Sequence, residues 1–245
     1  MNLVRNLARK VQRMARRPKQ RVFGIGLNKT GTTSLATALQ QLGFDVAPQE
    51  PFEALFDDWA ARRFDRIIRL CRRWQAFQDI PFSLPFTFQA LDAAYPGSLF
   101  VQTVRTTEEQ WLSSLLRYHA VVFGRGATPT RDDLASATYA GLGWALRVQR
   151  GVFMVGDDEP YNRDALLATY RYHNETIRRY FALRHGQLLV LDVSAPDAYS
   201  RLCTFVGRPP EERPFPVVNR TNANVAIRNA LEVAANDGSP IRPHS

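Results

Sequence analysis

The stretch Arg21-Val-Phe-Gly-Ile-Gly-Leu-Asn-Lys-Thr-Gly-Thr-Thr-Ser-Leu35 decides the fold of this chain. Val22 to Leu27 is a short apolar run of the kind that forms a buried strand. Lys29 to Ser34 is a turn of small and hydroxyl-bearing residues, and Leu35 to Leu42 has the apolar spacing of a helix. A strand, a tight turn and a helix start direct backbone N–H groups and the positive end of the helix at one point. The sequence therefore predicts an anion-binding loop, to which Lys29 adds a mobile positive charge.

The turn is close to the Walker A loop of nucleoside triphosphatases but differs from it. The pattern runs Gly-x-x-x-x-Asn-Lys-Thr from Gly24, so Asn28 stands where that loop has its second glycine. The next glycine, Gly31, follows the lysine instead. The simplest alternative is a turn of an ordinary α/β protein that binds nothing. Four hydroxyls and one lysine within the six residues 29–34 are hard to explain by packing alone.

The rest of the chain alternates short apolar runs with helical patterns. Strands are expected at 44–47, 76–81, 99–104 and 187–192, and helices at 52–70 with a break near 62–63, 86–95, 108–123, 131–149, 161–184 and 198–206. This alternation predicts an α/β fold, a three-layer sandwich with a central parallel sheet and a P-loop-like loop. Ligands of such sheets bind beyond the carboxyl ends of the strands. The polar residues expected there are Lys29, Asp79, Arg105 and Asp192.

Positive charge is concentrated at the N-terminus. Of a formal net charge of +9, eight charges come from the arginines and lysines of residues 1–21, which include no acid. A basic face across the whole domain is therefore not expected, which argues against nucleic acid as a partner. We divide the chain into a basic arm (1–20), one α/β domain (21–222) and a C-terminal helix or tail (223–245).

The basic arm also has an amphipathic pattern. Leu3, Leu7, Val11 and Met14 recur at helical spacing among the cations. Such a helix can lie on an anionic membrane surface, and a solvated tail is the equal alternative. The arm has no apolar core of a secretory signal, and no run of about 18 apolar residues could span a bilayer. We expect a cytoplasmic protein, with peripheral contact at the inner membrane face through residues 1–20.

Length and composition allow one substantial core. The chain has 245 residues and is 45% hydrophobic, which suits a single α/β domain. Its two cysteines, Cys71 and Cys203, have neither disulfide-framework nor metal-ligand spacing, so buried free thiols in a reducing compartment are expected. No metal site is predicted.

A second candidate for anion binding follows the strand at 99–104. Arg105 stands at the end of that strand, and Ser113 comes eight residues later on the next helix. An arginine presents a planar fork to two phosphate oxygens, and a serine two helical turns on can add a hydroxyl. The pair by itself is common, but together with the loop at 29–34 it predicts a ligand with two phosphate groups.

These two motifs resemble the sulfotransferase family. Lys-Thr-Gly-Thr-Thr-Ser34 is similar to the loop that grips the 5′-phosphosulfate of 3′-phosphoadenylyl sulfate (PAPS), and Arg105 with Ser113 to the pair that holds its 3′-phosphate. Thr106-Thr107 departs from the usual Asp or Asn and Pro after that arginine. The resemblance covers about residues 21–220 and includes the following further segments: Leu91–Gly97, Tyr170–Asn174, Leu188–Asp192, Leu202–Pro209, Pro214–Pro216 and Asn219.

The resemblance implies transfer of a sulfuryl group from PAPS to a hydroxyl or amine, without a metal. The residues that it assigns to PAPS are Lys29, Thr30, Gly31, Thr32, Thr33, Ser34, Arg105 and Ser113. Asp79 occupies the place of the catalytic histidine of cytosolic sulfotransferases, so it is the predicted base, with His119 and His173 as competitors. The insert between Leu115 and Arg163 is expected to form the wall for a small-molecule, sugar or lipid acceptor, with Tyr118, His119, Phe123, Trp144 and Phe153.

Two other classes of function stay open. One is a P-loop kinase or nucleotide hydrolase that uses Lys29, Thr30 and Asp192 with Mg²⁺. The other is a membrane-associated binding protein that keeps the fold without turnover. Asn28 in place of the loop glycine, and Gly31-Thr-Thr after the lysine, argue against the first. The presence of Lys29, Arg105 and Ser113 argues against the second.

Overall fold

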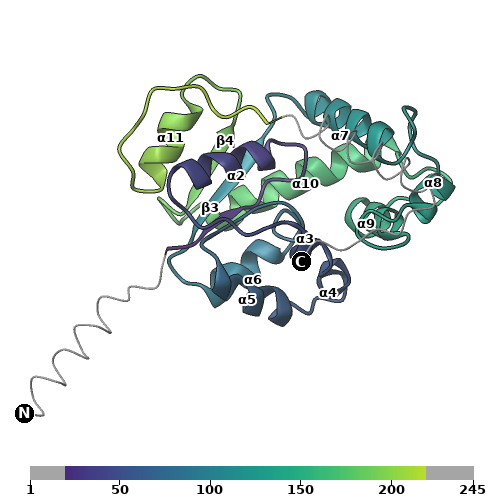
Figure 1. Ribbon diagram of the computed structural model, residues 1–245, viewed down its shortest axis with the longest axis horizontal. Helices are drawn as coiled ribbons and strands as arrows, with labels where there is room; N and C mark the ends of the chain where they lie inside the picture. The colour runs from purple at the N-terminus through teal and green to yellow at the C-terminus, as the bar shows by residue number, and fades with distance from the viewer. Residues whose placement is uncertain (1–19, 219–245) are drawn as a thin grey trace, which may run out of the picture.

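The computed structural model describes residues 20–218 (Figure 1). The predicted tail and all but the last residue of the predicted basic arm lie outside this range. Within it, no helix is long and apolar enough to cross a membrane.

Residues 20–218 form one α/β unit with four parallel strands. In chain order the elements are β1 (Val22–Gly24), α2 (Thr32–Gln41), α3 (Glu50–Glu53), α4 (Phe56–Ala60), α5 (Asp65–Leu70), the 3₁₀ turn η1 (Cys71–Arg73), β2 (Ala76–Phe77), α6 (Thr87–Ala94), β3 (Leu99–Val104), α7 (Glu108–Val122), α8 (Arg131–Ser136), α9 (Trp144–Phe153), α10 (Arg163–Phe181), β4 (Leu188–Asp192) and α11 (Ala198–Phe205). The strands pair in the order β2-β1-β3-β4, and every pairing is parallel. The predicted fold class is thus confirmed.

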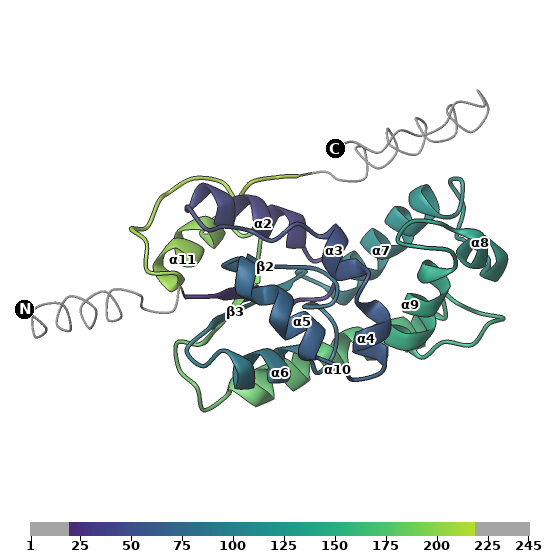
Figure 2. The same cartoon turned by 60° about the horizontal axis from the view of Figure 1, so that its bottom comes forward.

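Helices cover both faces of the sheet, as Figure 2 shows with α2 and α11 on one side and α5, α6 and α10 on the other. Side chains alternate along each strand, so neighbouring residues enter different cores. In β1, Val22 packs with the apolar side chains of α2 and α11, while Phe23 packs with those of α6 and α10. Phe100 of β3 lies on the second face, with its ring 4.8 Å from that of Phe181.

Several predicted elements are shorter or more divided than expected. The strands predicted at 22–27 and 76–81 are only Val22–Gly24 and Ala76–Phe77, and the helical stretch at 52–70 is also divided between α3 and α4. The strand predicted at 44–47 is a single bridge between Val46 and Ala76. The helix predicted at 131–149 is two helices, α8 and α9, because Gly141 and Gly143 adopt left-handed backbone conformations between them. The expected break near residue 62 is present, since Arg62 has a φ of 58° between α4 and α5.

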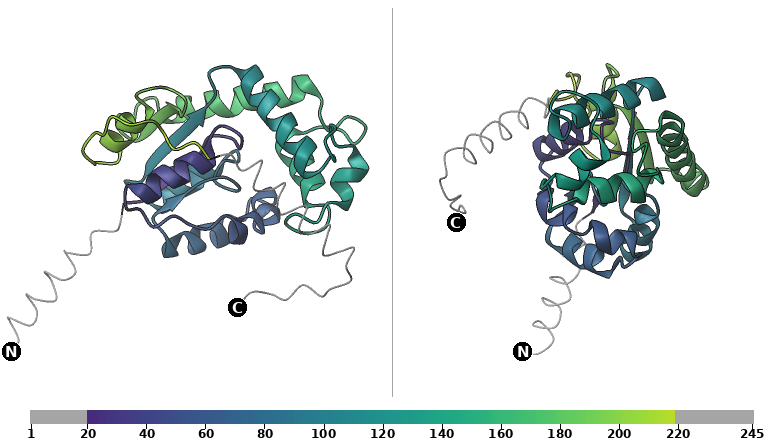
Figure 3. Two further views of the ribbon diagram at one scale, coloured as in Figure 1. Left: turned by 45° about the horizontal axis from the view of Figure 1, so that its top comes forward. Right: turned by 90° about the vertical axis from the view of Figure 1, so that its right-hand side faces the viewer.

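The strand order creates a switch point at β1. From β1 the chain crosses to β2 on one side and later to β3 on the other, so the loops after these strands diverge. The segment with α7, α8 and α9 lies beside this end of the sheet, on the opposite side of the molecule from α11 (Figures 1 and 3). A ligand-sized space between the β1 loop and this segment is the expected result.

Candidate active site

The loop after β1 fits closely against its neighbours. A Cβ on Gly26 would lie 2.1 Å from the carbonyl oxygen of Thr103, so only glycine lets the loop pass β3 at this distance. Gly31 has a φ of 103°, and a Cβ there would lie 2.6 Å from a methyl group of Val193. Lys29 itself is left-handed, with a φ of 69°. The loop therefore has one tightly defined path.

Two side chains from distant elements hold the carbonyl groups of this loop. Arg105 Nε donates to the carbonyl oxygen of Lys29 at 2.9 Å, and Trp111 Nε1 donates to that of Asn28 at 3.0 Å. Tyr170 stacks on Trp111 with 4.5 Å between the rings, and its hydroxyl accepts from the backbone N–H of Arg105. The end of β3, α7 and α10 thus fix the unusual backbone conformation at Lys29.

The start of α2 presents backbone donors at the same point. The first hydrogen bond of the helix runs from the N–H of Leu35 to the carbonyl oxygen of Gly31. The N–H groups of Thr32, Thr33 and Ser34 precede it and have no acceptor within the helix. The first turn carries no acid to compensate the helix dipole, so an anion is favoured here.

The side chains of two predicted PAPS ligands, Thr30 and Ser113, do not lie at the start of α2. The hydroxyl of Thr30 donates to the carbonyl oxygen of Leu27 and lies 2.6 Å from the hydroxyl of Thr103, in the buried interior. Ser113 is exposed on α7, and its neighbour Ser114 faces the cavity described next.

A cavity of about 380 Å³ opens beside the loop. One side, which we call the loop end, consists of Asn28, Lys29, Gly31, Thr32, Thr33, Ser34, Arg105, Ser114, Val193, Ser194, Pro216, Val217 and Val218. The other, the aromatic end, consists of Gln49, Glu53, Ile80, Tyr118, His119, Phe123, Tyr139, Trp144, Ala145 and Val148. Asp79 also lines the cavity. The cavity therefore joins the predicted phosphate site to most of the predicted acceptor wall; Phe153 is buried instead against Trp111.

Lys29 and Asp79 lie where the two ends meet. Lys29 Nζ stands over the ring of Tyr118, 3.4 Å from its centroid. Asp79 is left-handed, with a φ of 64°, and accepts from the hydroxyl of Thr32 at 3.2 Å and from the N–H of Ile80 at 2.9 Å. A cation from the loop after β1 and a carboxylate from the turn after the neighbouring strand β2 thus lie at the same boundary.

The two competing histidines occupy different surroundings. His119 lines the cavity, and its Nδ1 lies 2.7 Å from the hydroxyl of Tyr161. Burial, together with the charge of Lys29, lowers the pKa of His119 to about 3. His173 lies below the loop, where Nε2–H donates to the carbonyl oxygen of Ile25, and burial lowers its pKa to about 4. His119 can reach a ligand in the cavity, whereas His173 is a packed, hydrogen-bonded residue.

Asp192 serves the backbone turn after β4. One carboxylate oxygen accepts from the hydroxyl of Thr106, and the other accepts from the N–H and hydroxyl of Ser194. Partial burial acts to raise the pKa of Asp192, but these hydrogen bonds outweigh burial and hold the pKa below its usual range. Asp192 does not line the cavity, and it positions Thr106 beside Arg105.

Sequence reasoning missed Gln49, Glu53 and Tyr139. Glu53 is only 7% exposed although it is ionisable, and it accepts hydrogen bonds from Gln49 and Tyr139. An acid between Phe52 and Leu55 in an apolar run was the available signal. Tyr139 comes from the loop between α8 and α9, whose path depends on the glycines that divide the predicted helix.

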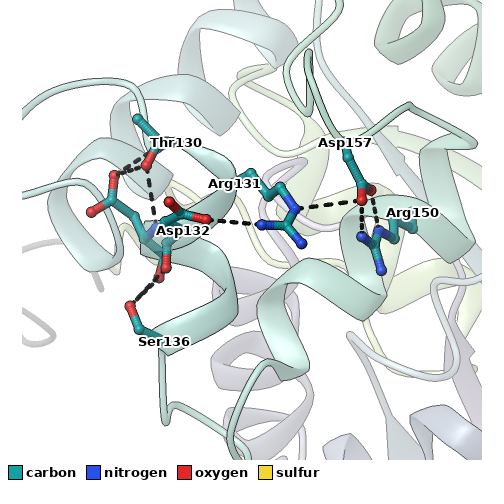
Figure 4. A network of polar contacts seen from close by, with 7 residues as sticks. Thr130, Arg131, Asp132, Ser136, Arg150 and Asp157 are labelled. Carbon is teal, nitrogen blue, oxygen red and sulfur yellow. Dashed lines mark hydrogen bonds and ion pairs between the residues drawn. The ribbon is translucent and has the colours of Figure 1, made fainter.

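The outer side of the aromatic end is tied by a polar network (Figure 4). Asp157, in the loop after α9, pairs with Arg150 of α9 and Arg131 of α8. Thr130 caps α8 through a reciprocal pair with Asp133. These groups are exposed, so solvent screens each ion pair and the single pairs contribute little to stability. The network joins α8, α9 and the following loop into the unit that carries Trp144 and Tyr161.

The parallel sheet, the loop with free helix N–H groups at its switch point and the adjoining cavity are features of α/β proteins that bind ligands at the carboxyl ends of their strands. A family model of the sulfotransferase domain matches residues 21–224 of the chain. The chain belongs to the sulfotransferase family. A search of curated proteins gave no match.

Proposed function

We propose that the protein is a PAPS-dependent sulfotransferase, in which the loop end binds PAPS and the aromatic end binds the acceptor. The observation that carries this proposal is the single cavity that contains both ends, with Lys29 and Asp79 at their boundary. Family membership supports sulfuryl transfer in general. The donor, the acceptor and the residue roles below are our inference.

The 5′-phosphosulfate belongs at the start of α2. The N–H groups of Thr32, Thr33 and Ser34 and the ammonium group of Lys29 supply donors and positive charge there. Arg105 holds the loop through Nε, and its terminal N–H groups supply the bidentate fork for the 3′-phosphate. Ser113 was predicted as the second 3′-phosphate ligand, and Ser114 is the alternative that faces the cavity.

In the proposed reaction the acceptor oxygen attacks sulfur while the bond from sulfur to the bridging phosphate oxygen breaks. The electron pair of that bond goes to adenosine 3′,5′-bisphosphate, and Lys29 stabilises the negative charge that develops there. The proton of the acceptor hydroxyl goes to Asp79, which lies beside the loop through its bond from Thr32. His119 is the second candidate for this base, because it also lines the cavity.

The alternative of a nucleotide kinase has less support from the site. It needs the carboxylate of Asp192 near the phosphates, but both of its oxygens are engaged by Thr106 and Ser194. It also needs the hydroxyl of Thr30, which points into the protein.

The proposed cellular setting follows from the sequence alone. Residues 1–20 have the composition of a basic amphipathic arm, for which we propose peripheral contact with an anionic membrane surface and a cytoplasmic location. Removal of residues 1–20 should lower co-sedimentation with phosphatidylserine vesicles and leave nucleotide binding unchanged.

A thermal-shift panel tests the proposed donor. Adenosine 3′,5′-bisphosphate should raise the melting temperature in the presence of EDTA, because a ligand that binds only the folded state stabilises it. ADP, ATP with Mg²⁺ and NAD are the comparison ligands. Stabilisation by ATP with Mg²⁺, without any by the bisphosphate, would reject the sulfotransferase proposal in favour of the kinase.

A further inference from the structure

His119 has one ring nitrogen that is engaged and one that opens on the cavity. Nδ1 lies 2.7 Å from the hydroxyl oxygen of Tyr161. Nε2 makes no hydrogen bond within residues 20–218 and is not sealed in the interior, so it faces the cavity that His119 lines. The residue is only 7% exposed. A ligand that fills the aromatic end therefore meets Nε2, and the hydrogen-bonding character of this atom limits which ligands fit.

The imidazole ring of His119 is held in one orientation. Phe123 packs edge to face against this ring at 5.2 Å, and Tyr161 does so at 5.6 Å. Tyr161 is fixed in turn by its neighbours in the chain. The buried Gln149 of α9 donates through Nε2 to the carbonyl oxygen of Pro160 at 2.7 Å, and Asn162 is the N-cap of α10. The ring cannot turn over and exchange its two nitrogens without breaking these contacts.

The tautomer of His119 follows from the single hydrogen of the Tyr161 hydroxyl. Burial lowers the pKa of His119 to about 3 and raises the pKa of Tyr161, so both groups are neutral at pH 7. A neutral imidazole carries one hydrogen, on either Nδ1 or Nε2. If Nδ1 carried it, the tyrosine hydrogen would have no acceptor within residues 20–218. The Tyr161 hydroxyl therefore donates to Nδ1, and the imidazole hydrogen is on Nε2.

A hydrogen-bond donor at this position makes the aromatic end selective. Most of its other lining groups are apolar or aromatic, among them Phe123, Trp144, Ala145 and Val148, so they suit an apolar ligand body. Solvent satisfies Nε2–H before a ligand binds. A ligand with an oxygen at this point replaces that hydrogen bond, whereas a purely apolar ligand leaves the donor unpaired, which costs roughly tenfold to 100-fold in affinity.

We propose that His119 donates a hydrogen bond from Nε2–H to the acceptor substrate, that Tyr161 fixes this tautomer, and that the acceptor therefore carries a second oxygen, such as an ether, a carbonyl or a further hydroxyl, in addition to the hydroxyl that is sulfated. This inference rests on the proposed sulfotransferase function.

The same tautomer decides between the two candidates for the base. The lone pair of a protonated Nε2 belongs to the aromatic ring, so this atom cannot take a proton from the nucleophile. In the transfer the acceptor oxygen forms the bond to sulfur, and its proton goes to Asp79. The bridging oxygen of PAPS leaves with the electron pair of the broken bond, and His119 keeps its hydrogen throughout.

NMR of the full chain with ¹⁵N-labelled histidine at pH 7 tests the tautomer. We expect the proton of His119 on Nε2 and an unprotonated Nδ1 that accepts a hydrogen bond. Tyr161→Phe should shift the Nδ1 signal, because the variant has lost the donor. Tyr172→Phe removes an exposed hydroxyl from α10 and should leave this signal unchanged. A proton on Nδ1 of His119 would overturn the proposal.

Matched acceptors test the second oxygen. The full chain is incubated with ³⁵S-labelled PAPS and either 3-methoxyphenol or 3-ethylphenol, and in parallel with either 4-methoxyphenol or 4-ethylphenol. Each pair exchanges an ether oxygen for a methylene group of similar size. We expect kcat/KM to be roughly tenfold higher or more for the methoxy member of at least one pair.

Two variants of His119 distinguish a hydrogen-bond donor from a base. The amide N–H of His119→Gln can replace Nε2–H but cannot accept a proton, so this variant should keep the preference and turn over within about tenfold of the parent. His119→Leu has a similar volume without a donor and should lose the preference. An equal and larger loss of turnover in both variants would identify His119 as the base and overturn its role as a donor. Adenosine 3′,5′-bisphosphate should bind both variants as it binds the parent if they fold correctly.

The possible results separate this inference from the proposed function. Equal use of both members of each pair, preference for the ethyl members, a preference that survives His119→Leu, or no transfer to any of the four phenols by a protein that binds the bisphosphate would each overturn the second oxygen alone. A protein that fails to bind the bisphosphate would reject the donor assignment, and the acceptor proposal with it. The tautomer of His119 is measured without any ligand, so its result does not depend on that assignment.

Discussion

The two ends of the cavity are built in different ways. The charged and backbone donor groups of the loop end come from one continuous stretch, residues 28–34, and from Arg105 at the end of the neighbouring strand, while Ser114, Val193, Ser194 and residues 216–218 complete its lining. The aromatic end takes side chains from α3, α7, the loop between α8 and α9, and α9 itself. A site for a constant group, such as a phosphate, can be made from local backbone geometry. A site for a variable acceptor requires side chains from several elements, which can change independently.

The largest effect is expected at the boundary between the ends. Asp79→Asn should lower turnover by roughly 10²–10⁴, the usual contribution of a positioned base, and leave bisphosphate affinity unchanged. Lys29→Ala should lower turnover as well. It should also weaken the binding of the bisphosphate, because the charge of Lys29 acts at the loop end. Steady-state kinetics and calorimetry on both variants measure the contrast.

If the turnover of Asp79→Asn stays within a few-fold of that of the parent, Asp79 is not the general base. His119→Asn is then the decisive variant, since His119 is the other candidate base that lines the cavity.

Acid should destabilise both ends through their buried histidines. His119 at the aromatic end and His173 below the loop have folded pKa values of about 3 and about 4. In the unfolded chain a histidine has a pKa near 6.5, so the unfolded state binds more protons below that pH. The free energy of unfolding should be at its full value above about pH 6.5 and should fall as the pH drops toward 4. The two histidines together should lower it by on the order of a few kcal/mol.

Urea denaturation between pH 4 and pH 7 measures this slope. His173→Gln should flatten it because the variant has lost one of the two protonation sites. His185→Gln, which changes an exposed histidine, is the control and should keep the slope of the parent. An unchanged slope in His173→Gln would show that the pKa of this imidazole is the same in the folded and the unfolded state, which would contradict its lowered pKa.

Arg105→Ala sharpens the comparison within the loop end. It should weaken the binding of adenosine 3′,5′-bisphosphate by about 1.5–3 kcal/mol, the range for hydrogen bonds to charged groups. The affinity for adenosine 5′-monophosphate should fall by less. Its loss should come only from the loop, because the variant lacks the hydrogen bond from Arg105 to the carbonyl oxygen of Lys29. Arg105→Lys restores the charge without the fork, so only a partial recovery is expected. Equal losses for the two nucleotides would remove Arg105 from the 3′-phosphate.

A smaller effect should distinguish Ser113 from Ser114. Removal of a serine hydroxyl that binds the 3′-phosphate should cost about 1 kcal/mol in bisphosphate affinity, while the other alanine variant should match the parent. Ser114 faces the cavity and Ser113 is exposed, so the geometry favours a loss for Ser114→Ala. A loss confined to Ser113→Ala would instead support the assignment made from sequence spacing.

The same contrast explains how far sequence reasoning reached. The alternating pattern predicted the parallel sheet and its covering helices, and the 29–34 motif predicted the anion-binding geometry, because both depend on residues that are neighbours in the chain. The inward orientation of Thr30 could not be predicted, since it depends on the distant Thr103. Glu53 and Tyr139 were missed for a related reason: their meeting requires the loop path set by Gly141 and Gly143.

The crystal structure of the complex with adenosine 3′,5′-bisphosphate tests the central claim most directly. We predict that the 5′-phosphate lies against the N–H groups of Thr32, Thr33 and Ser34, that the 3′-phosphate contacts Arg105, and that the aromatic end stays open to solvent. A nucleotide seated in the aromatic end, or one whose 3′-phosphate lies away from Arg105, would contradict the division of the cavity into a donor site and an acceptor site.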